Sequence, residues 1–301
     1  MSKHEWRADR KQGDPPVYHD HFYRSSDNRL TLYARIYEGD GPPLLLMHGL
    51  TRNSADFEGL AAHLAGEYRL IIADQRGRGR SDYDPEPENY TPAVYVDDMM
   101  ALLDDLRLSK VGLIGTSMGG LMAMMMAAAE PQRFNSLILN DIGPVVEQDG
   151  LDRIQNYVGE IAPFANWQQA AEHCREVHSD AMVGYGDQDW MDFARHTCQQ
   201  LPDGRIAFAY DPAISQGLSG DDQTVVPADL WPVWDQLDTI PTLIIYGLLS
   251  DIISPTTIAE MQRRHSGPIS TAAVPDRGHA PMLDEPAALA AIDPFLQNLE
   301  R

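Results

Sequence analysis

Cysteine and long apolar runs are scarce in this sequence of 301 residues. Its two cysteines, Cys174 and Cys198, cannot form a disulfide framework, so we expect a reducing compartment, the cytoplasm. No apolar run approaches the roughly 18 residues that a membrane-spanning helix needs. The N-terminal segment MSKHEWRADRKQGDPP is polar and lacks the apolar centre of a secretory signal. The sequence therefore predicts a soluble cytoplasmic protein.

Positive charge is also scarce. The chain has 23 Lys and Arg against 45 Asp and Glu, a formal net charge of −22 at pH 7. Such a surface repels nucleic acid and anionic membranes, so we expect neither as a partner and a small molecule as the substrate. His173, His178 and His196 lack the spacing of metal ligands and are interpreted as surface or core residues. We expect no metal and no cofactor, and the sequence indicates no oligomeric state.

Short apolar runs alternate with helical patterns along most of the chain. A turn signal at Asp27-Asn28 predicts an antiparallel hairpin of residues 21–25 and 30–37. The later apolar runs are typical of strands buried on both faces of a sheet, and their alternation with helices favours an α/β fold with a mostly parallel sheet. The predicted buried strands are 44–47, 70–73, 111–114, 136–139, 243–246 and 270–274, and the predicted helices are 55–65, 92–106, 118–129, 256–265 and 286–299.

Residues 144–240 interrupt this alternation. Helical patterns occur at 151–161 and 167–178, and the segment is too long for a structureless loop. We predict a mostly helical cap of residues 144–240, inserted after the sixth strand into a core of residues 1–143 and 241–301. The cap is expected over the carboxyl edge of the sheet, where α/β proteins bind ligands. A plain structural extension is the alternative, but the aromatic content favours a pocket wall that includes Trp190 and Tyr210.

A serine stands between a predicted strand and a predicted helix in the motif G-T-S-M-G at residues 115–119. This context matches the G-x-S-x-G nucleophile elbow, a strained turn that exposes the serine hydroxyl. The flanking glycines allow close backbone approach, and the following helix presents free amides at its N-terminus. We therefore predict Ser117 as a nucleophile, with an ordinary turn as the alternative.

The base and acid that would activate this serine are sought at the same edge of the sheet. His279 follows the last predicted strand in D-R-G-H-A-P, and we predict it as the base. An acid must fix the tautomer of the base, and two aspartates follow predicted strands. Asp251 lies after strand 243–246 and Asp141 after strand 136–139. We favour Asp251 as the acid and interpret Asp141 as a structural turn, although geometry decides between them.

A tetrahedral intermediate also requires amide donors for its oxyanion. The stretch H-G-L at 48–50 follows strand 44–47, so we predict the Leu50 and Met118 amides as the two donors. His48 is expected to brace this loop, and both His48 and Gly49 to border the substrate pocket. The three arginines of D-Q-R-G-R-G-R-S at 74–81 fit no phosphate-binding motif, so we interpret them as structural.

Taken in order, H-G-L-T, D-Q-R-G-R-G-R-S, G-T-S-M-G-G, G-x-x-S-D and G-H-A-P resemble the α/β-hydrolase superfamily between Asp20 and Leu299. The resemblance implies a Ser117–His279–Asp251 triad, an oxyanion hole and a helical cap between the sixth and seventh strands. It is closest in character to small bacterial ester, lactone and carbon–carbon bond hydrolases. The absence of an H-G-G-G run disfavours esters of bulky alcohols, and serine in place of aspartate disfavours dehalogenation.

The expected activity is hydrolysis of a small carboxylic ester through an acyl-enzyme on Ser117. The same triad serves carbon–carbon bond hydrolases, lactonases and cofactor-free perhydrolases, and fold does not choose among them. In a different class, a catalytically weak ligand receptor uses the same fold. An intact Ser, His and Asp set disfavours that alternative, because a receptor does not need it.

Overall fold

The computed structural model describes residues 16–218 and 229–299. The polar segment that we compared with a secretory signal lies almost wholly outside these described residues. No helix within them has the length and apolar character of a membrane span.

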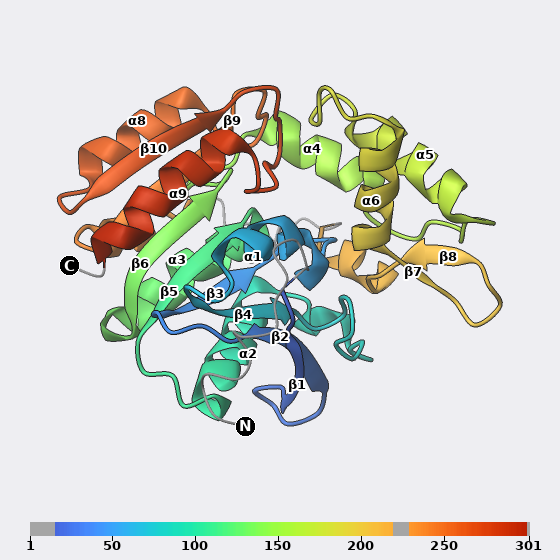
Figure 1. The fold of residues 1–301 in the computed structure, drawn as a ribbon, viewed down its shortest axis with the longest axis horizontal. Coiled ribbons are helices and arrows are strands. Elements are labelled where there is room, and N and C mark those ends of the chain that lie inside the picture. The colour runs from blue at the N-terminus through green and yellow to red at the C-terminus, as the bar shows by residue number, and fades with distance from the viewer. Residues whose placement is uncertain (1–15, 219–228, 300–301) are drawn as a thin grey trace.

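An eight-stranded sheet forms the centre of the molecule (Figure 1). Its strand order is β1-β2-β4-β3-β5-β6-β9-β10, in which β2 runs antiparallel to β1 and β4 and the remaining neighbours are parallel. The predicted hairpin and mostly parallel sheet are thereby confirmed. The central strands are buried along most of their length, as their continuous apolar sequences predict. The strands are β1 (His19–Arg24), β2 (Thr31–Tyr37), β3 (Pro43–Met47), β4 (Arg69–Asp74), β5 (Val111–Thr116), β6 (Phe134–Asn140), β9 (Thr242–Gly247) and β10 (Ile269–Val274).

Helices cover both faces of this sheet. In β3, Leu45 and Met47 join the core on the face of α2 and α3, whereas Leu44 and Leu46 join the core on the face of α1 and α9. This alternation follows from the two-residue period of a strand. All five predicted helices of this region are present to within a few residues. The helices are α1 (Glu58–Leu64), preceded by the 3-10 turn η1 (Ser54–Phe57), α2 (Pro92–Asp105), α3 (Met118–Ala129), α7 (Trp231–Trp234), α8 (Pro255–Arg264) and α9 (Pro286–Leu299).

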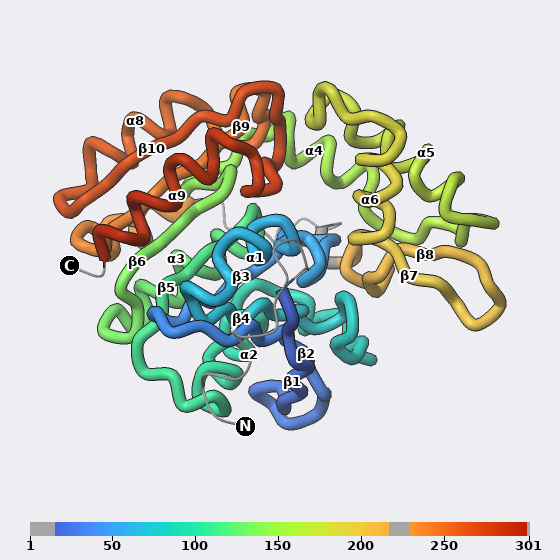
Figure 2. The backbone as a smooth tube through the Cα atoms, viewed as in Figure 1, coloured from blue at the N-terminus to red at the C-terminus, as the bar shows by residue number. Residues whose placement is uncertain are grey.

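A mostly helical cap is inserted between β6 and β9, as predicted, and lies to one side of the sheet (Figures 1 and 2). It has a small apolar core of its own, which includes Cys174, Trp190 and Phe193. The helix predicted at 151–161 begins and ends earlier, and the two-stranded sheet of β7 and β8 was not predicted. Helix α7 falls within the predicted cap range but packs on α3, so the returning chain joins the core before residue 240. The cap elements are α4 (Gln148–Tyr157), α5 (Trp167–His178), α6 (Asp187–Thr197), β7 (Cys198–Gln200), β8 (Ile206–Phe208) and the 3-10 helix η4 (Pro212–Leu218).

The three arginines that follow β4 all have protein partners. Arg76 is fully buried and donates from Nε and Nη2 to the two oxygens of Asp98, at 2.7 and 2.9 Å, and from Nη1 to Asp84 Oδ2 at 2.6 Å. Arg78 is also buried and donates to backbone oxygens, whereas Arg80 pairs with a surface carboxylate. These contacts confirm the structural interpretation of the arginine-rich stretch.

We expect Arg76→Met to lower the free energy of unfolding by about 3–5 kcal/mol, because two buried carboxylates lose their cation. Urea unfolding followed by circular dichroism measures this change. The matched control is Arg80→Met, which breaks an ion pair about half exposed on both sides and should leave the midpoint almost unchanged. Equal losses in the two variants would contradict the assignment of the buried cluster as a stability element.

Candidate active site

Ser117 occupies the turn between the end of β5 at Thr116 and the start of α3 at Met118. Its φ of 53° lies in the left-handed region, which an L-residue adopts only at a cost of about 1–3 kcal/mol. A Cβ on Gly115 would lie 2.3 Å from the Gly119 carbonyl oxygen, and one on Gly119 would lie 2.0 Å from a backbone oxygen of β3. The motif therefore needs glycine at both positions, and the strained turn holds the serine side chain at the carboxyl edge of the sheet.

His279 joins Ser117 to a buried carboxylate. Its Nε2 lies 2.8 Å from Ser117 Oγ, and its Nδ1 lies 2.8 Å from Asp141 Oδ2. Because a carboxylate can only accept, Nδ1 carries the ring proton and Nε2 is free to accept the proton of the serine hydroxyl. The predicted pairing of Ser117 with His279 is present, and Asp141 completes the hydrogen-bonded series.

The Asp141 carboxylate accepts hydrogen bonds from the end of β9, from the loop after β9 and from the loop after β10. It is fully buried just after β6, and its own N–H donates to the Ile245 carbonyl of β9. Gly247 N–H donates to Oδ1 at 2.8 Å, and the Ser250 hydroxyl donates to Oδ2 at 2.7 Å. With the His279 ring, the carboxylate thus accepts three hydrogen bonds, enough to compensate for the burial of its charge.

Asp251 does not reach His279, which corrects the predicted choice of acid. Its carboxylate pairs in a bidentate manner with Arg153 of α4, at 2.5 and 2.7 Å. Burial alone would raise the pKa of Asp251, but the Arg153 pair outweighs burial and holds that pKa below its usual range. The adjacent Ser250 directs its hydroxyl to Asp141, while Asp251 points toward the cap. The sequence placed both aspartates after strands, and the direction of one side chain in a loop decided between them.

The two predicted oxyanion donors flank Ser117. Met118 is the first residue of α3, so its N–H has no acceptor within the helix, and Leu50 lines the same cavity as Ser117. Among the described residues, neither amide donates to a protein acceptor. The Gly49 carbonyl accepts from His48 Nδ1 at 2.7 Å and from Arg52 N–H at 3.2 Å. Because N–H and C=O of a trans peptide point in opposite directions, these bonds fix the direction of the Leu50 amide.

His48 braces this loop from behind and does not line the cavity. Its Nδ1–H donates to the Gly49 carbonyl, and its Nε2 accepts from Gln75 N–H at 3.2 Å. Complete burial lowers the pKa of His48 to about 3, so the ring is neutral. The expected bracing role therefore agrees with these contacts, whereas the expected place of His48 in the pocket wall is wrong because the ring is enclosed by the core.

Arg78 contacts both residues that supply the candidate donors, a connection that the sequence did not reveal. Its Nε donates to the Leu50 carbonyl at 2.9 Å, and its Nη2 lies 3.9 Å from Met118 Sδ. The guanidinium is fully buried and lies 4.6 Å from the ring centre of Tyr95. It therefore supports the loop after β3 against the start of α3.

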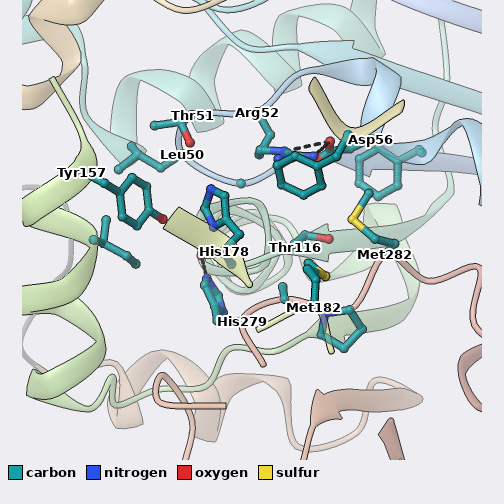
Figure 3. Close-up of a pocket in the computed structure, with 17 residues that line it drawn as sticks. Leu50, Thr51, Arg52, Asp56, Thr116, Tyr157, His178, Met182, His279 and Met282 are labelled. Atoms are coloured by element: carbon teal, nitrogen blue, oxygen red, sulfur yellow. Dashed lines mark hydrogen bonds and ion pairs between the residues drawn. The ribbon is translucent and has the colours of Figure 1, made fainter. Parts of the chain in front are cut away.

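A cavity opens above Ser117 between the core and the cap (Figure 3). The core supplies the loop after β3, the elbow and the segment that follows His279. The cap supplies apolar side chains from α4 and α6 and two residues at and beyond the end of α5. The lining residues from the cap are Ile154, Tyr157, His178, Met182 and Phe193.

The predicted pocket wall is only partly present. Gly49 lines the cavity, but Trp190 is 3% exposed and packs inside the apolar core of the cap. Tyr210 lines a smaller neighbouring cavity, and its hydroxyl donates to the Gly159 carbonyl at 3.1 Å. Sequence reasoning missed His178, interpreted there as a surface or core residue, because sequence spacing does not indicate which cap side chains face the core.

Comparison with known proteins gives one family and several similar hydrolases. Residues 42–286 match the family model for the alpha/beta hydrolase fold. The 3-hydroxybutyrate-oligomer hydrolase of Cupriavidus necator is 32% identical over 286 residues, which cover 88% of this chain and 93% of that protein. The 2-(acetamidomethylene)succinate hydrolase of Mesorhizobium japonicum is 30% identical over 81% of this chain and 84% of its own. A crystal structure of an alpha/beta hydrolase from Novosphingobium aromaticivorans is 41% identical, with a TM-score of 0.87 and coverage of 95% and 99%.

The two aspartates should behave differently when each is changed to asparagine. Asp141→Asn would present an amide to His279 and favour the wrong ring tautomer, so we expect kcat for a p-nitrophenyl ester to fall about 10⁴-fold. Asp251→Asn should reduce kcat by less than about tenfold, because it weakens a part-exposed ion pair with the cap. Steady-state kinetics on both purified variants measure the difference. A larger loss from Asp251→Asn would restore Asp251 as the acid.

Proposed function

We propose that this chain, which belongs to the α/β-hydrolase fold family and is a hydrolase, cleaves a small carboxylic ester through an acyl-enzyme at Ser117. The observation that supports the proposal is the hydrogen-bonded series from Ser117 through His279 to Asp141, with 2.8 Å at both contacts. A serine hydroxyl is a weak nucleophile until a base accepts its proton, and this geometry supplies the base.

Each step of the proposed reaction uses an atom described above. His279 Nε2 accepts the proton of Ser117 as Oγ attacks the ester carbonyl carbon, and Asp141 stabilises the imidazolium. The Leu50 and Met118 amides donate to the oxyanion of the tetrahedral intermediate. The imidazolium then gives its proton to the leaving alcohol as the ester C–O bond breaks. Water, deprotonated by His279, attacks the acyl-serine. The imidazolium then returns the proton to Ser117 Oγ as the acyl C–Oγ bond breaks and the carboxylic acid leaves.

An ester is the favoured substrate because of the relatives. A protein similar over most of both chains is a 3-hydroxybutyrate-oligomer hydrolase, and oligomers of a hydroxy acid are joined by ester bonds. The lining contributed by the cap is largely apolar, which suits a short acyl chain. Lactone, carbon–carbon bond and perhydrolytic reactions use the same triad, and a weakly active receptor is the alternative outside enzymes.

The first test of the proposed function is Ser117→Ala. The wild-type protein should release a burst of one p-nitrophenolate per chain from p-nitrophenyl butyrate and be labelled by a fluorophosphonate. The variant should lose the burst, the label and about 10⁴-fold or more of the turnover, while its thermal midpoint changes little. Stopped-flow absorbance and intact-protein mass measure these results. Labelling of another residue in the variant would contradict the assignment of Ser117, and an unlabelled wild type would favour the receptor.

A substrate panel on the wild-type protein separates the remaining reactions. It contains p-nitrophenyl esters, a 3-hydroxybutyrate dimer, a small lactone, a vinylogous diketone and 2-(acetamidomethylene)succinate. We expect the highest kcat/KM on esters. A higher value on the lactone, the diketone or the succinate would replace the ester by that substrate class.

The cap should determine acyl chain length through Met182. This side chain is 4% exposed and lines the cavity, so Met182→Ala removes apolar contact and creates space for a longer acyl group. We expect the preference for p-nitrophenyl octanoate over acetate to rise about 10- to 100-fold in kcat/KM. The matched control is Met191→Ala, a cap methionine that packs in the apolar core of the cap and is absent from the cavity lining. Equal shifts in both variants would show that the cap acts only through its own packing.

A further inference from the structure

A cationic side chain from the core faces the active-site cavity on the side of the cap. Arg52 follows the loop that presents Leu50, and its side chain is 13% exposed. Its guanidinium lies 3.9 Å from the ring centre of Phe193 in α6. In the view of Figure 3, Arg52 and Asp56 lie across the cavity from His279.

The guanidinium of Arg52 is only partly used by protein acceptors. Its Nε donates to both carboxylate oxygens of Asp56, at 2.8 Å, and its Nη2 donates to one of them. Nη1 makes no hydrogen bond to an acceptor among residues 16–218 and 229–299. A guanidinium has five N–H groups in a fixed plane, so several donors remain at the edge that Asp56 does not cover.

His178 is a second side chain in this cavity with unused hydrogen-bonding capacity. Its ring packs against those of Tyr157 and Phe193, with centres 5.3 and 5.2 Å apart. In the described part of the chain, neither ring nitrogen has a hydrogen-bond partner. Burial, reinforced by nearby arginines, lowers the pKa of His178 to about 3, so the neutral ring offers one donor and one acceptor.

Among the described residues, Arg52 is the only Lys or Arg and Asp56 the only Asp or Glu in the lining of this cavity. Burial lowers the pKa of Arg52, but Asp56 outweighs burial and leaves that pKa above its usual range, so the guanidinium remains charged. Arg153, from the neighbouring helix α4, is paired with Asp251. Within the described part of the chain, the free nitrogens of Arg52 and His178 are not sealed off from the cavity, so an oxygen of a ligand can accept from them there. A hydrogen bond from a charged donor such as Arg52 is stronger than one between neutral groups.

We propose that Arg52 and His178 form a subsite for an oxygen acceptor of the substrate, either a second carbonyl or a carboxylate beyond the scissile ester. The inference rests on the proposed function and deepens it. The substrate class becomes an ester whose acyl part bears another oxygen group. A plain alkyl chain would cover the Arg52 donors without pairing them and would bind less well.

Three p-nitrophenyl esters with the same four-carbon acyl chain test this subsite. They are the butyrate, the hydrogen succinate and the methyl succinate, which end in a methyl group, a carboxylate and a neutral carbonyl. We expect kcat/KM of the wild-type protein to be higher for at least one oxygenated ester than for the butyrate. A preference for the hydrogen succinate alone identifies a carboxylate, and a preference for both identifies any carbonyl oxygen.

Two variants connect this preference to the subsite. Arg52→Met keeps the apolar stem and removes the donors, and it should reduce the ratio of oxygenated to alkyl kcat/KM about 10- to 100-fold. His178→Phe keeps the ring packing and removes the nitrogens, and it should reduce the ratio about 3- to 10-fold. Arg52→Met leaves Asp56 without its cation and could fail to fold for that reason. In that case His178→Phe still tests the subsite.

Matched controls come from the same cap. His173→Phe changes another ring-packed histidine of α5 that is absent from the Ser117 cavity, and Arg195→Met changes an arginine that lies over the ring of Trp167. Neither control should alter the ratio of kcat/KM for the oxygenated esters to kcat/KM for the butyrate. A wild-type ratio of one would overturn the proposal, and so would a ratio that stays unchanged in both Arg52→Met and His178→Phe.

Failure of the proposed function would be seen separately. Alkyl phosphonates with a methyl or a methyl-ester terminus label Ser117 without requiring turnover, and the ratio of their labelling rates reports the same subsite. If the protein turns over no ester but the labelling ratio falls in Arg52→Met, the esterase function is overturned and the subsite is supported. Ester turnover without any preference overturns the subsite alone.

Discussion

Asp141 joins two distant parts of the chain at one buried carboxylate. Its oxygens accept from Gly247 at the end of β9, from Ser250 in the loop that follows β9, and from His279 after β10. Since β5, β6 and β9 are adjacent and parallel, their carboxyl ends meet, and Ser117 lies beside this carboxylate. The orientation of His279, and hence its reach to the serine hydroxyl, depends on this one charged group and on the burial that leaves it no alternative partner.

The cap completes the site by binding the loops that hold the catalytic candidates. The carbonyl of Ala181 accepts from Gly278 N–H at 2.7 Å, directly beside His279, and Asp251 binds Arg153 of α4. These contacts join the loops after β9 and β10 to the cap. The cap is therefore a second support for the position of the imidazole as well as one wall of the cavity at Ser117. A ligand between the two layers meets the polar Ser117 and Arg52 of the core, and a cap surface that is apolar apart from Tyr157 and His178.

The site residues that were wrongly predicted from the sequence share one physical cause. Asp141 and Asp251 both follow strands of the sheet, and each satisfies the chain order expected for an acid. The structure separates them because Ser250 directs its hydroxyl to Asp141, while the next residue turns toward an arginine of the cap. In the same way, Trp190 has the size and polarity of a pocket residue but packs inside the cap. Which way a side chain points depends on contacts between distant segments, and local pattern carries no information about them.

The sequence by itself determined most of the elements, their order and the positions of the candidate nucleophile and the candidate base. Periodicity and turn chemistry are local properties, so the apolar runs, the glycines around Ser117 and the histidine after the last strand could be recognised without coordinates. Only the tertiary structure decided that Asp141 holds His279, that His48 supports the loop from behind, and that His178 reaches the cavity from the cap. Each of these facts joins residues far apart in the chain, and such distances are set by how the cap and the sheet pack together.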